Sequence, residues 1–165
     1  MKLKYSGLII CNTTPLLYLH QIHLLAIIKD ICGDIVVPPA VIRELKAGAD
    51  QGVSVPDIGQ YNWITVKEPV AVSAHNLIKD LGDGETEVLM LALEMPGSMV
   101  ILDDNLARTY AYINSIDVIG TCGLLVKAKY FGLIPSVTPV LDLLDQKGFF
   151  LSKEFRKTVI SLARE

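Results

Sequence analysis

The chain alternates short apolar runs with longer segments of helical periodicity, and this alternation limits the fold more than any other feature. The short runs cover residues 8–11, 34–37, 63–66, 98–102 and 117–119. Continuous apolar runs of this length are typical of strands that are buried on both faces. Strands that alternate with helices form a mostly parallel sheet with helices on both sides. The sequence therefore predicts a three-layer α/β/α sandwich with about five strands.

Caps, apolar periodicity and glycine breaks predict the helices. One helix is expected after the cap at Asn12, with an apolar face that runs to Ile28. Others are expected over residues 40–46, ending near Gly48, and over about 72–80, 85–95, 105–114, 121–131, 136–147 and 152–164. Residues 48–60, rich in Gly, Asp, Gln and Pro, are expected to form a loop. No linker is evident, so residues 1–165 are expected to form one domain, with the helices of 136–165 appended to it.

Composition limits the class of protein. With 165 residues, 51% of them hydrophobic, the chain suits one well-filled domain. The net charge of −3 argues against a strongly basic nucleic-acid-binding surface, although a partner subunit could supply basic residues. An odd cysteine count without a CxxC pair (Cys11, Cys32 and Cys122) predicts reduced core residues in a cytoplasmic protein. No apolar stretch is long enough for a membrane-spanning helix.

Polar and acidic side chains follow two of the predicted strands. Asn12 and Thr13 come directly after the first strand, and Asp103 and Asp104 come directly after the fourth. In open parallel sheets, ligands bind outside the carboxyl ends of the strands. We therefore expect these side chains to lie at one edge of the sheet.

Three glutamates on the predicted helices can reach the same edge. Glu44 lies on the helix after the second strand, and Glu85 and Glu87 lie in the first turn of the helix before the fourth. Hard divalent cations prefer oxygen ligands, and crowded carboxylates repel one another without a cation. Taken singly, each acid suits an ordinary cap, helix terminus or surface position. Only the combination favours a metal site that acts on phosphate esters.

Five segments, in order, resemble PIN-domain proteins. IICNTTPL (9–16) resembles the opening strand and turn of the family, and VVPPAVIREL (36–45) resembles its glutamate-bearing helix. LGDGETE (81–87) resembles the G-E-x-E helix, and VILDDNLAR (100–108) resembles the last acidic strand end. Residues 120–135 resemble the tail of one prokaryotic PIN-like subfamily, which is similar to the VapC-like toxins of toxin–antitoxin pairs.

The resemblance implies a ribonuclease that depends on Mg²⁺ or Mn²⁺. It implies that Glu44, Glu85 and Asp103 hold the metal with Asn12 in the fourth place, and that these four are the catalytic residues. It implies auxiliary roles for Thr13, Glu87 and Asp104. It also implies RNA as the substrate, a homodimer and a small antitoxin protein as partner. The apolar segment 110–113 could serve such a dimer or belong to the core.

Asn12 is the departure from the family pattern, which has an aspartate at the end of the first strand. An amide oxygen can contact a metal, but it brings no charge and cannot act as a base. We therefore expect nuclease activity that is low or depends on metal concentration. The alternative is a degenerate PIN-fold module that binds RNA or an antitoxin without cutting, with phosphates held by basic residues (Lys79, Arg108, Lys127 and Lys129).

Two other α/β phosphate-handling folds fit the sequence poorly. A receiver domain needs an acidic pair after the first strand, where Asn12 and Thr13 stand. A haloacid-type phosphatase needs a DxD motif where residues 12–14 read NTT.

Overall fold

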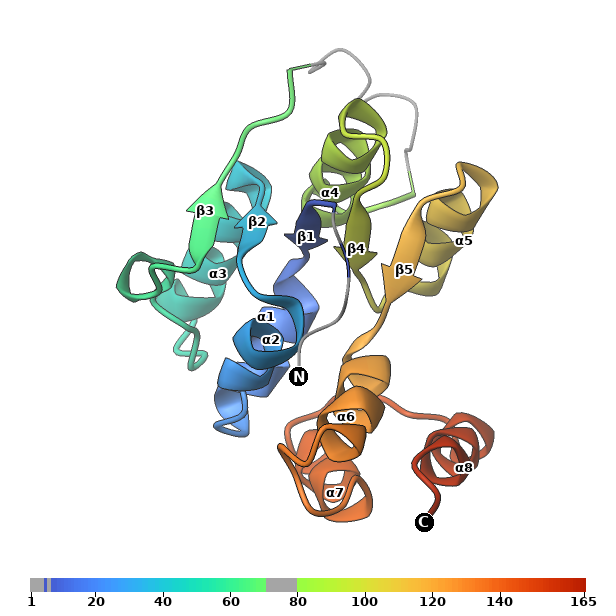
Figure 1. The fold of residues 1–165 in the computed structure, drawn as a ribbon. Helices are drawn as coiled ribbons and strands as arrows, with labels where there is room; N and C mark the ends of the chain where they lie inside the picture. The colour runs from blue at the N-terminus through green and yellow to red at the C-terminus, as the bar shows by residue number, and fades with distance from the viewer. Residues whose placement is uncertain (1–4, 6, 71–79) are drawn as a thin grey trace.

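Five parallel strands form one sheet in the described residues, in the order β3-β2-β1-β4-β5 (Figure 1). The computed structural model describes residue 5 and residues 7–70 and 80–165. The strands are β1 (Ile9–Cys11), β2 (Ile35–Val37), β3 (Ile64–Val66), β4 (Met99–Ile101) and β5 (Asp117–Ile119). Each lies within the run predicted for it. Strands β2 and β3 lie on one side of β1, and β4 and β5 lie on the other. The strand order therefore reverses at β1, which pairs with both β2 and β4.

Burial along the strands explains their continuous apolar character. All residues of β1, β2 and β4 are buried, and Ile10 and Val100 are fully so. The outer strands β3 and β5 carry exposed residues, among them Val66 and Asp117. The three inner strands are therefore covered on both faces, which requires helices on both sides of the sheet.

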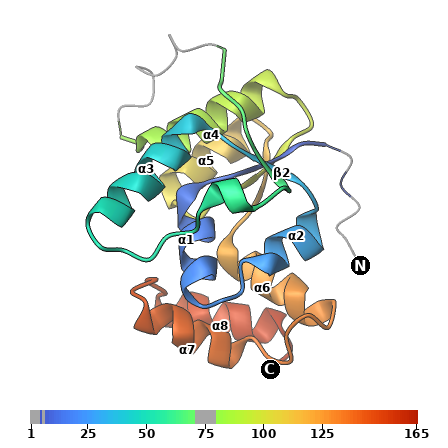
Figure 2. The same cartoon turned by 90° about the vertical axis from the view of Figure 1, so that its left-hand side faces the viewer.

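The helices supply those two outer layers. They are α1 (Thr13–Gln21), α2 (Ala26–Cys32), α3 (Pro39–Asp50), α4 (Asp83–Glu94), α5 (Asn105–Ile113), α6 (Thr121–Tyr130), α7 (Thr138–Gln146) and α8 (Lys153–Leu162). Figure 2 shows α3, α4 and α5 together on one side of the sheet and α2 with α6 on the other. The predicted three-layer α/β fold is confirmed. None of the helices in the described part of the chain has the length and hydrophobicity to cross a membrane.

The segment after β1 forms two helices, so the prediction of one continuous helix was wrong. α1 ends at Gln21, and His23 adopts a left-handed φ of 60° before α2 begins at Ala26. The amide of Leu24 donates to the carbonyl of Leu19 at 2.8 Å and closes the turn. A left-handed residue that ends a helix is usually Gly or Asn, so a histidine at this position is a much weaker signal of a break.

α3 is longer than predicted. It continues through Gly48, where the prediction ended it, to Asp50, and the chain then turns at Gly52 with φ 80°. A glycine inside a helix costs only about 1 kcal/mol, which packing against α1 and α4 can offset.

The predicted loop 48–60 also contains a short 3-10 helix, η1 (Ile58–Gln60). The helix predicted for 72–80 lies outside the described residues except for residue 80, which is in a turn.

Candidate active site

Asn12 lies at the carboxyl end of β1 with its side chain buried. Its backbone amide donates to Ile101 on β4 at 3.1 Å, which holds it against the neighbouring strand. Its side-chain Nδ2 donates to Oε1 of Glu85 at 2.7 Å rather than capping α1. The other side-chain atom, Oδ1, is buried and has no hydrogen-bond partner among the described residues. A buried, unpartnered polar atom costs about 1–3 kcal/mol, so a cation or donor placed here would be stabilising.

Glu44 connects two distant segments at this edge of the sheet. Its Oε2 accepts a hydrogen bond from the hydroxyl of Thr13, at the start of α1. Its Oε1 accepts one from the backbone amide of Gly84, in the first turn of α4, at 2.8 Å. The positive end of a helix dipole favours a carboxylate in this position. Glu44 is therefore held at one point between α1 and α4.

The glycines of the α4 first turn let the backbone approach these oxygens closely. A Cβ on Gly84 would stand 2.5 Å from Oε2 of Glu44 and 2.8 Å from Oδ1 of Asn12. A Cβ on Gly82 would stand 2.5 Å from Oε2 of Glu85 and 3.9 Å from Oε1 of Glu44. The unpartnered amide oxygen and the two carboxylates therefore border the same turn of α4. We call these residues (Asn12, Thr13, Glu44, Gly84 and Glu85) the Asn12 network.

Asp103 belongs to a second network at the end of the adjacent strand. Its Oδ1 accepts from the amide of Thr121 at 2.8 Å, and its Oδ2 accepts from the hydroxyl of Thr121 at 2.6 Å. Burial raises the pKa of the Asp103 carboxyl, whereas the Thr121 hydrogen bonds and the charge of Arg108 oppose this rise. A Cβ on Gly120 would lie 2.9 Å from both Asp103 Oδ1 and Arg108 Nη1. Asp103 is thus fixed in one orientation beside a guanidinium.

Glu44, Glu85 and Asp103 were predicted to hold one metal ion together at this edge of the sheet. The structure joins Glu44 and Glu85 through the Asn12 network and places Asp103 with Thr121 on the neighbouring strand end. In the described part of the chain, no three His, Cys, Asp or Glu side chains lie close enough together to hold a metal ion. A cation site at this edge would therefore depend on Asn12 and water as well as the carboxylates.

Glu87 and Asp104, predicted as auxiliary residues, make contacts that hold helix ends. Glu87 is buried on α4, where it accepts from the amide of Ala40 at 2.7 Å and pairs with Arg43 at 2.7 Å. It therefore ties α4 to the start of α3. Asp104 caps α5 by accepting from the amide of Ala107 at 2.8 Å.

Thr121 and Gly84, which hold Asp103 and Glu44, were not among the residues predicted for the site. Thr121 lies two residues after β5, so the rule that singled out the first and fourth strand ends also applied to it. Gly84 stands between two acids in a helical first turn, where its role depends on what approaches from α3 and β1.

The three cysteines are free thiols in this structure. Cys11 and Cys122 are buried, and burial raises the pKa of Cys122 to about 12. A thiol that stays protonated near neutral pH is a poor nucleophile and metal ligand.

One comparison with known proteins gave a match. A family model described as DUF3368, a PIN domain, matches residues 8–165. The chain belongs to the PIN-domain family. No curated protein and no solved structure gave a match. PIN domains have a nuclease fold, generally use divalent metal ions and generally bind RNA. In this PIN domain the matched region includes α7 and α8, so the C-terminal helices belong to the family pattern.

The donor set of this PIN domain fits a hard divalent cation. The Asn12 network offers an amide oxygen without a donor and two carboxylates around it. Amide and carboxylate oxygens are the ligands that such ions take, and Mg²⁺ commonly keeps several waters beside one or two carboxylates. A cation beside Oδ1 of Asn12 would also relieve the repulsion between this oxygen and the Glu44 carboxylate.

Proposed function

We propose that this PIN domain is a metal-dependent endoribonuclease whose activity is lowered by Asn12. The observation that carries the proposal is the buried Oδ1 of Asn12, which has no donor and lies with the Glu44 carboxylate beside Gly84. We assign Asn12, Glu44, Glu85 and Asp103 as the catalytic residues that hold the ion, Mg²⁺ or Mn²⁺, directly or through bound water. Thr13, Glu87 and Asp104 support them by holding Glu44 and the ends of α3 and α5.

The chain's own residues prepare this edge for hydrolysis of a phosphodiester. When bound, the ion would acidify a water and stabilise charge on phosphoryl oxygens. Thr13 and the Gly84 amide orient Glu44, and Thr121 orients Asp103, so neither carboxylate must reorganise when substrate arrives. Such preorganisation is a general source of rate enhancement. Asn12 supplies a contact without charge, which weakens the hold on a cation.

A binding module that does not cut RNA is the second candidate. Glu44 and Glu85 already accept hydrogen bonds from the protein, and Asp103 lies in a separate network. Of the basic residues predicted to hold phosphates, Lys79 lies outside the described residues. Lys129 contacts the carbonyl of Ala163 and the carboxylate of Glu165. RNA or a small antitoxin protein would be the partner of such a module.

The resemblance to VapC-like toxins supports a further part of the proposal. We place the protein in the cytoplasm as a homodimeric toxin, built as one domain over residues 1–165 and inhibited by a small antitoxin protein. Expression of the chain alone is expected to arrest growth, and co-expression of a neighbouring small reading frame is expected to relieve the arrest. Growth that continues without any partner would contradict the toxin assignment.

Cleavage of RNA in Mn²⁺ tests the enzyme directly. The Asn12→Asp variant is expected to cleave about 10- to 100-fold faster than the natural protein, since it restores a charged contact to the ion. Asp103→Ala is expected to be inactive. Asn62→Asp, an equal charge change at an exposed position, serves as the control and should leave the rate unchanged. If Asn12→Asp cuts no faster than Asp103→Ala, the catalytic assignment is wrong.

Metal titration separates the two candidates without RNA. A ligand that binds only the folded state raises the melting temperature, and at a fixed ligand concentration the rise increases with the logarithm of its affinity. Mn²⁺ is expected to raise the melting temperature of the natural protein, and to raise that of Asn12→Asp further. If Mn²⁺ stabilises neither protein, the endoribonuclease is contradicted and the binding module is favoured.

A further inference from the structure

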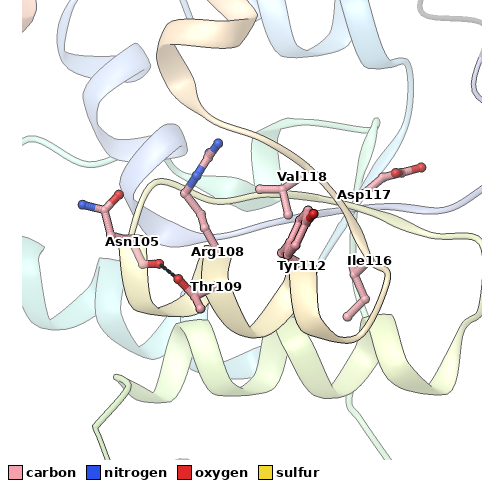
Figure 3. Close-up of a pocket in the computed structure, with 7 residues that line it drawn as sticks. All are labelled: Asn105, Arg108, Thr109, Tyr112, Ile116, Asp117 and Val118. Carbon is pink, nitrogen blue, oxygen red and sulfur yellow. Dashed lines mark hydrogen bonds between the residues drawn. The ribbon is translucent and has the colours of Figure 1, made fainter. Parts of the chain in front are cut away.

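A groove of about 660 Å³ lies between α5 and β5, beside the Asp103 network (Figure 3). Its lining residues are Asn105, Arg108, Thr109, Tyr112, Ile116, Asp117 and Val118. The first four lie three and four positions apart, which places them on one face of α5. The last three come from the chain that enters and forms β5. Because β5 is the outermost strand on this side of the sheet, no further strand among the described residues covers the groove.

The groove combines an exposed aromatic ring with two aliphatic side chains. Tyr112 is 84% exposed, whereas Ala107 and Ala111 on the opposite face of α5 are fully buried. Ile116 and Val118 are half-buried, and Figure 3 shows the ring of Tyr112 beside Val118. An exposed aromatic ring over aliphatic side chains is the arrangement on which nucleic-acid bases stack.

Arg108 joins the groove to the Asp103 network. Its Nη1 donates to the carbonyl of Leu102 at 2.9 Å. A Cβ added to Gly120 would lie 2.9 Å from this nitrogen and 2.9 Å from Asp103 Oδ1, so both groups border Gly120. A guanidinium carries five N–H donors, and the hydrogen bond to Leu102 uses one of them. Arg108 is thus placed to meet a phosphate between Asp103 and the groove.

Charge sets the direction in which a nucleotide would lie. Asp117 stands at the other end of the groove, and in Figure 3 its carboxylate points away from Tyr112. A phosphate is therefore favoured near Arg108 and disfavoured near Asp117. The net charge of −3 also makes general attraction of RNA weak, so stacking must supply part of the affinity.

We infer that the groove binds one nucleotide of single-stranded RNA next to the cleaved bond, with its base on Tyr112 and its phosphate at Arg108. The inference rests on the proposed function for the identity of the ligand and adds where the strand lies. Every base has a face that can stack, so little base preference is expected. Duplex RNA is not bound in the groove, because its bases are already stacked and paired.

Binding of a short labelled single-stranded RNA in EDTA, followed by fluorescence anisotropy, tests the groove without cleavage. Tyr112→Ala is expected to raise the Kd about 5- to 100-fold, and Tyr112→Phe, which keeps the ring, is expected to bind as the natural protein does. Tyr130→Ala is the matched control, since Tyr130 is 80% exposed on α6 outside the groove. Arg108→Gln is expected to reduce the slope of log Kd against log salt by about one.

Several results would overturn the inference. These are no RNA binding by the natural protein in EDTA, equal weakening by Tyr112→Ala and Tyr130→Ala, and duplex RNA that competes as well as single strands. If Tyr112→Ala leaves RNA binding intact but separates two copies of the chain in solution, the groove is a protein interface.

Different results would contradict the proposed RNA-binding groove and the proposed endoribonuclease. RNA binding that depends on Tyr112, without cleavage in Mn²⁺, would support the groove and reject the endoribonuclease. Cleavage in Mn²⁺, together with RNA binding that does not change in Tyr112→Ala, would reject the groove and support the endoribonuclease.

Discussion

At the scale of single residues, an amide and a carboxylate at position 12 have different consequences for the Asn12 network. The Nδ2 of Asn12 donates to Glu85 at 2.7 Å. An aspartate would place a second carboxylate at this distance from Glu85, and the two would repel each other in the absence of a cation. Asn12 therefore holds the Asn12 network together by hydrogen bonding, at the expense of charge that would attract a metal.

Thr121 provides a residue-scale test of how Asp103 is held. Thr121 is fully buried and its hydroxyl donates to Asp103 Oδ2 at 2.6 Å. Thr121→Val keeps the shape but leaves that carboxylate oxygen without its donor, so urea denaturation is expected to show a loss of about 1–3 kcal/mol in unfolding free energy.

Thr158→Val is the control for this test. Thr158 donates to the carbonyl of Glu154 on the exposed α8, so its replacement should change stability by less than about 0.5 kcal/mol. Equal losses in the two variants would show that the Thr121 hydroxyl does not hold Asp103.

At the scale of secondary-structure elements, the start of α4 organises the candidate site. α4 begins at Asp83, so the Gly84 amide falls in the first turn, where backbone amides have no partner within the helix. Glu44 from α3 satisfies that amide, and Glu87 from α4 satisfies the amide of Ala40 at the start of α3. The two helices thus cap each other with carboxylates, which explains their close packing.

Two helical glycines make a matched test of this packing. Gly84→Ala would place a Cβ 2.5 Å from Glu44 Oε2, and we expect this crowding to cost about 1–3 kcal/mol of unfolding free energy and to weaken Mn²⁺ binding. Gly48→Ala in α3 meets nothing closer than 3.5 Å and is expected to stabilise the protein by up to about 1 kcal/mol. Denaturant unfolding of both variants provides the comparison. Stabilisation by both would mean that the α4 turn has room for a side chain.

At the scale of the whole molecule, Glu165 connects α6 and α7 near the end of α8. The Glu165 carboxylate accepts from the amide of Val137 at 2.6 Å and that of Thr138 at 2.9 Å, at the start of α7. It also pairs with Lys129 of α6 at 2.9 Å. The hydrogen bonds from Thr138, Val137 and Ser136 hold the pKa of Glu165 well below its usual range. The charged carboxylate therefore stabilises the folded chain.

The pH dependence of stability follows from the sign of this shift. Because the folded pKa lies below the unfolded value near 4.5, the stabilisation is fully present above about pH 4.5 and is lost as the pH falls through the folded pKa. Glu165→Gln is expected to be less stable than the natural protein at pH 7, and the difference is expected to shrink as the pH falls below 4.5. Urea denaturation at several pH values measures it. A difference that does not change with pH would exclude this role for the charge.

The amino-acid sequence by itself determined the order of the strands and helices along the chain. Continuous apolar runs mark strands covered on both faces, and this signal is local, so the five strands and the C-terminal helices fall close to their predicted places. The same rule placed Asn12 and Asp103 at one edge of the sheet, and the structure adds that their strands, β1 and β4, are neighbours. The segments that resemble PIN domains lie within the matched residues 8–165.

Only the tertiary structure decided which side chains meet. The hydrogen bond from Asn12 to Glu85 joins residues 73 positions apart, and the choice of Thr121 as the partner of Asp103 depends on how α6 follows β5. The break between α1 and α2 at His23 was likewise not predicted, because the apolar pattern continues through it from Leu19 to Ile28. Hydrogen bonds between distant segments depend on strand register and helix packing to within an ångström or so, which a local pattern of apolar and polar residues does not specify.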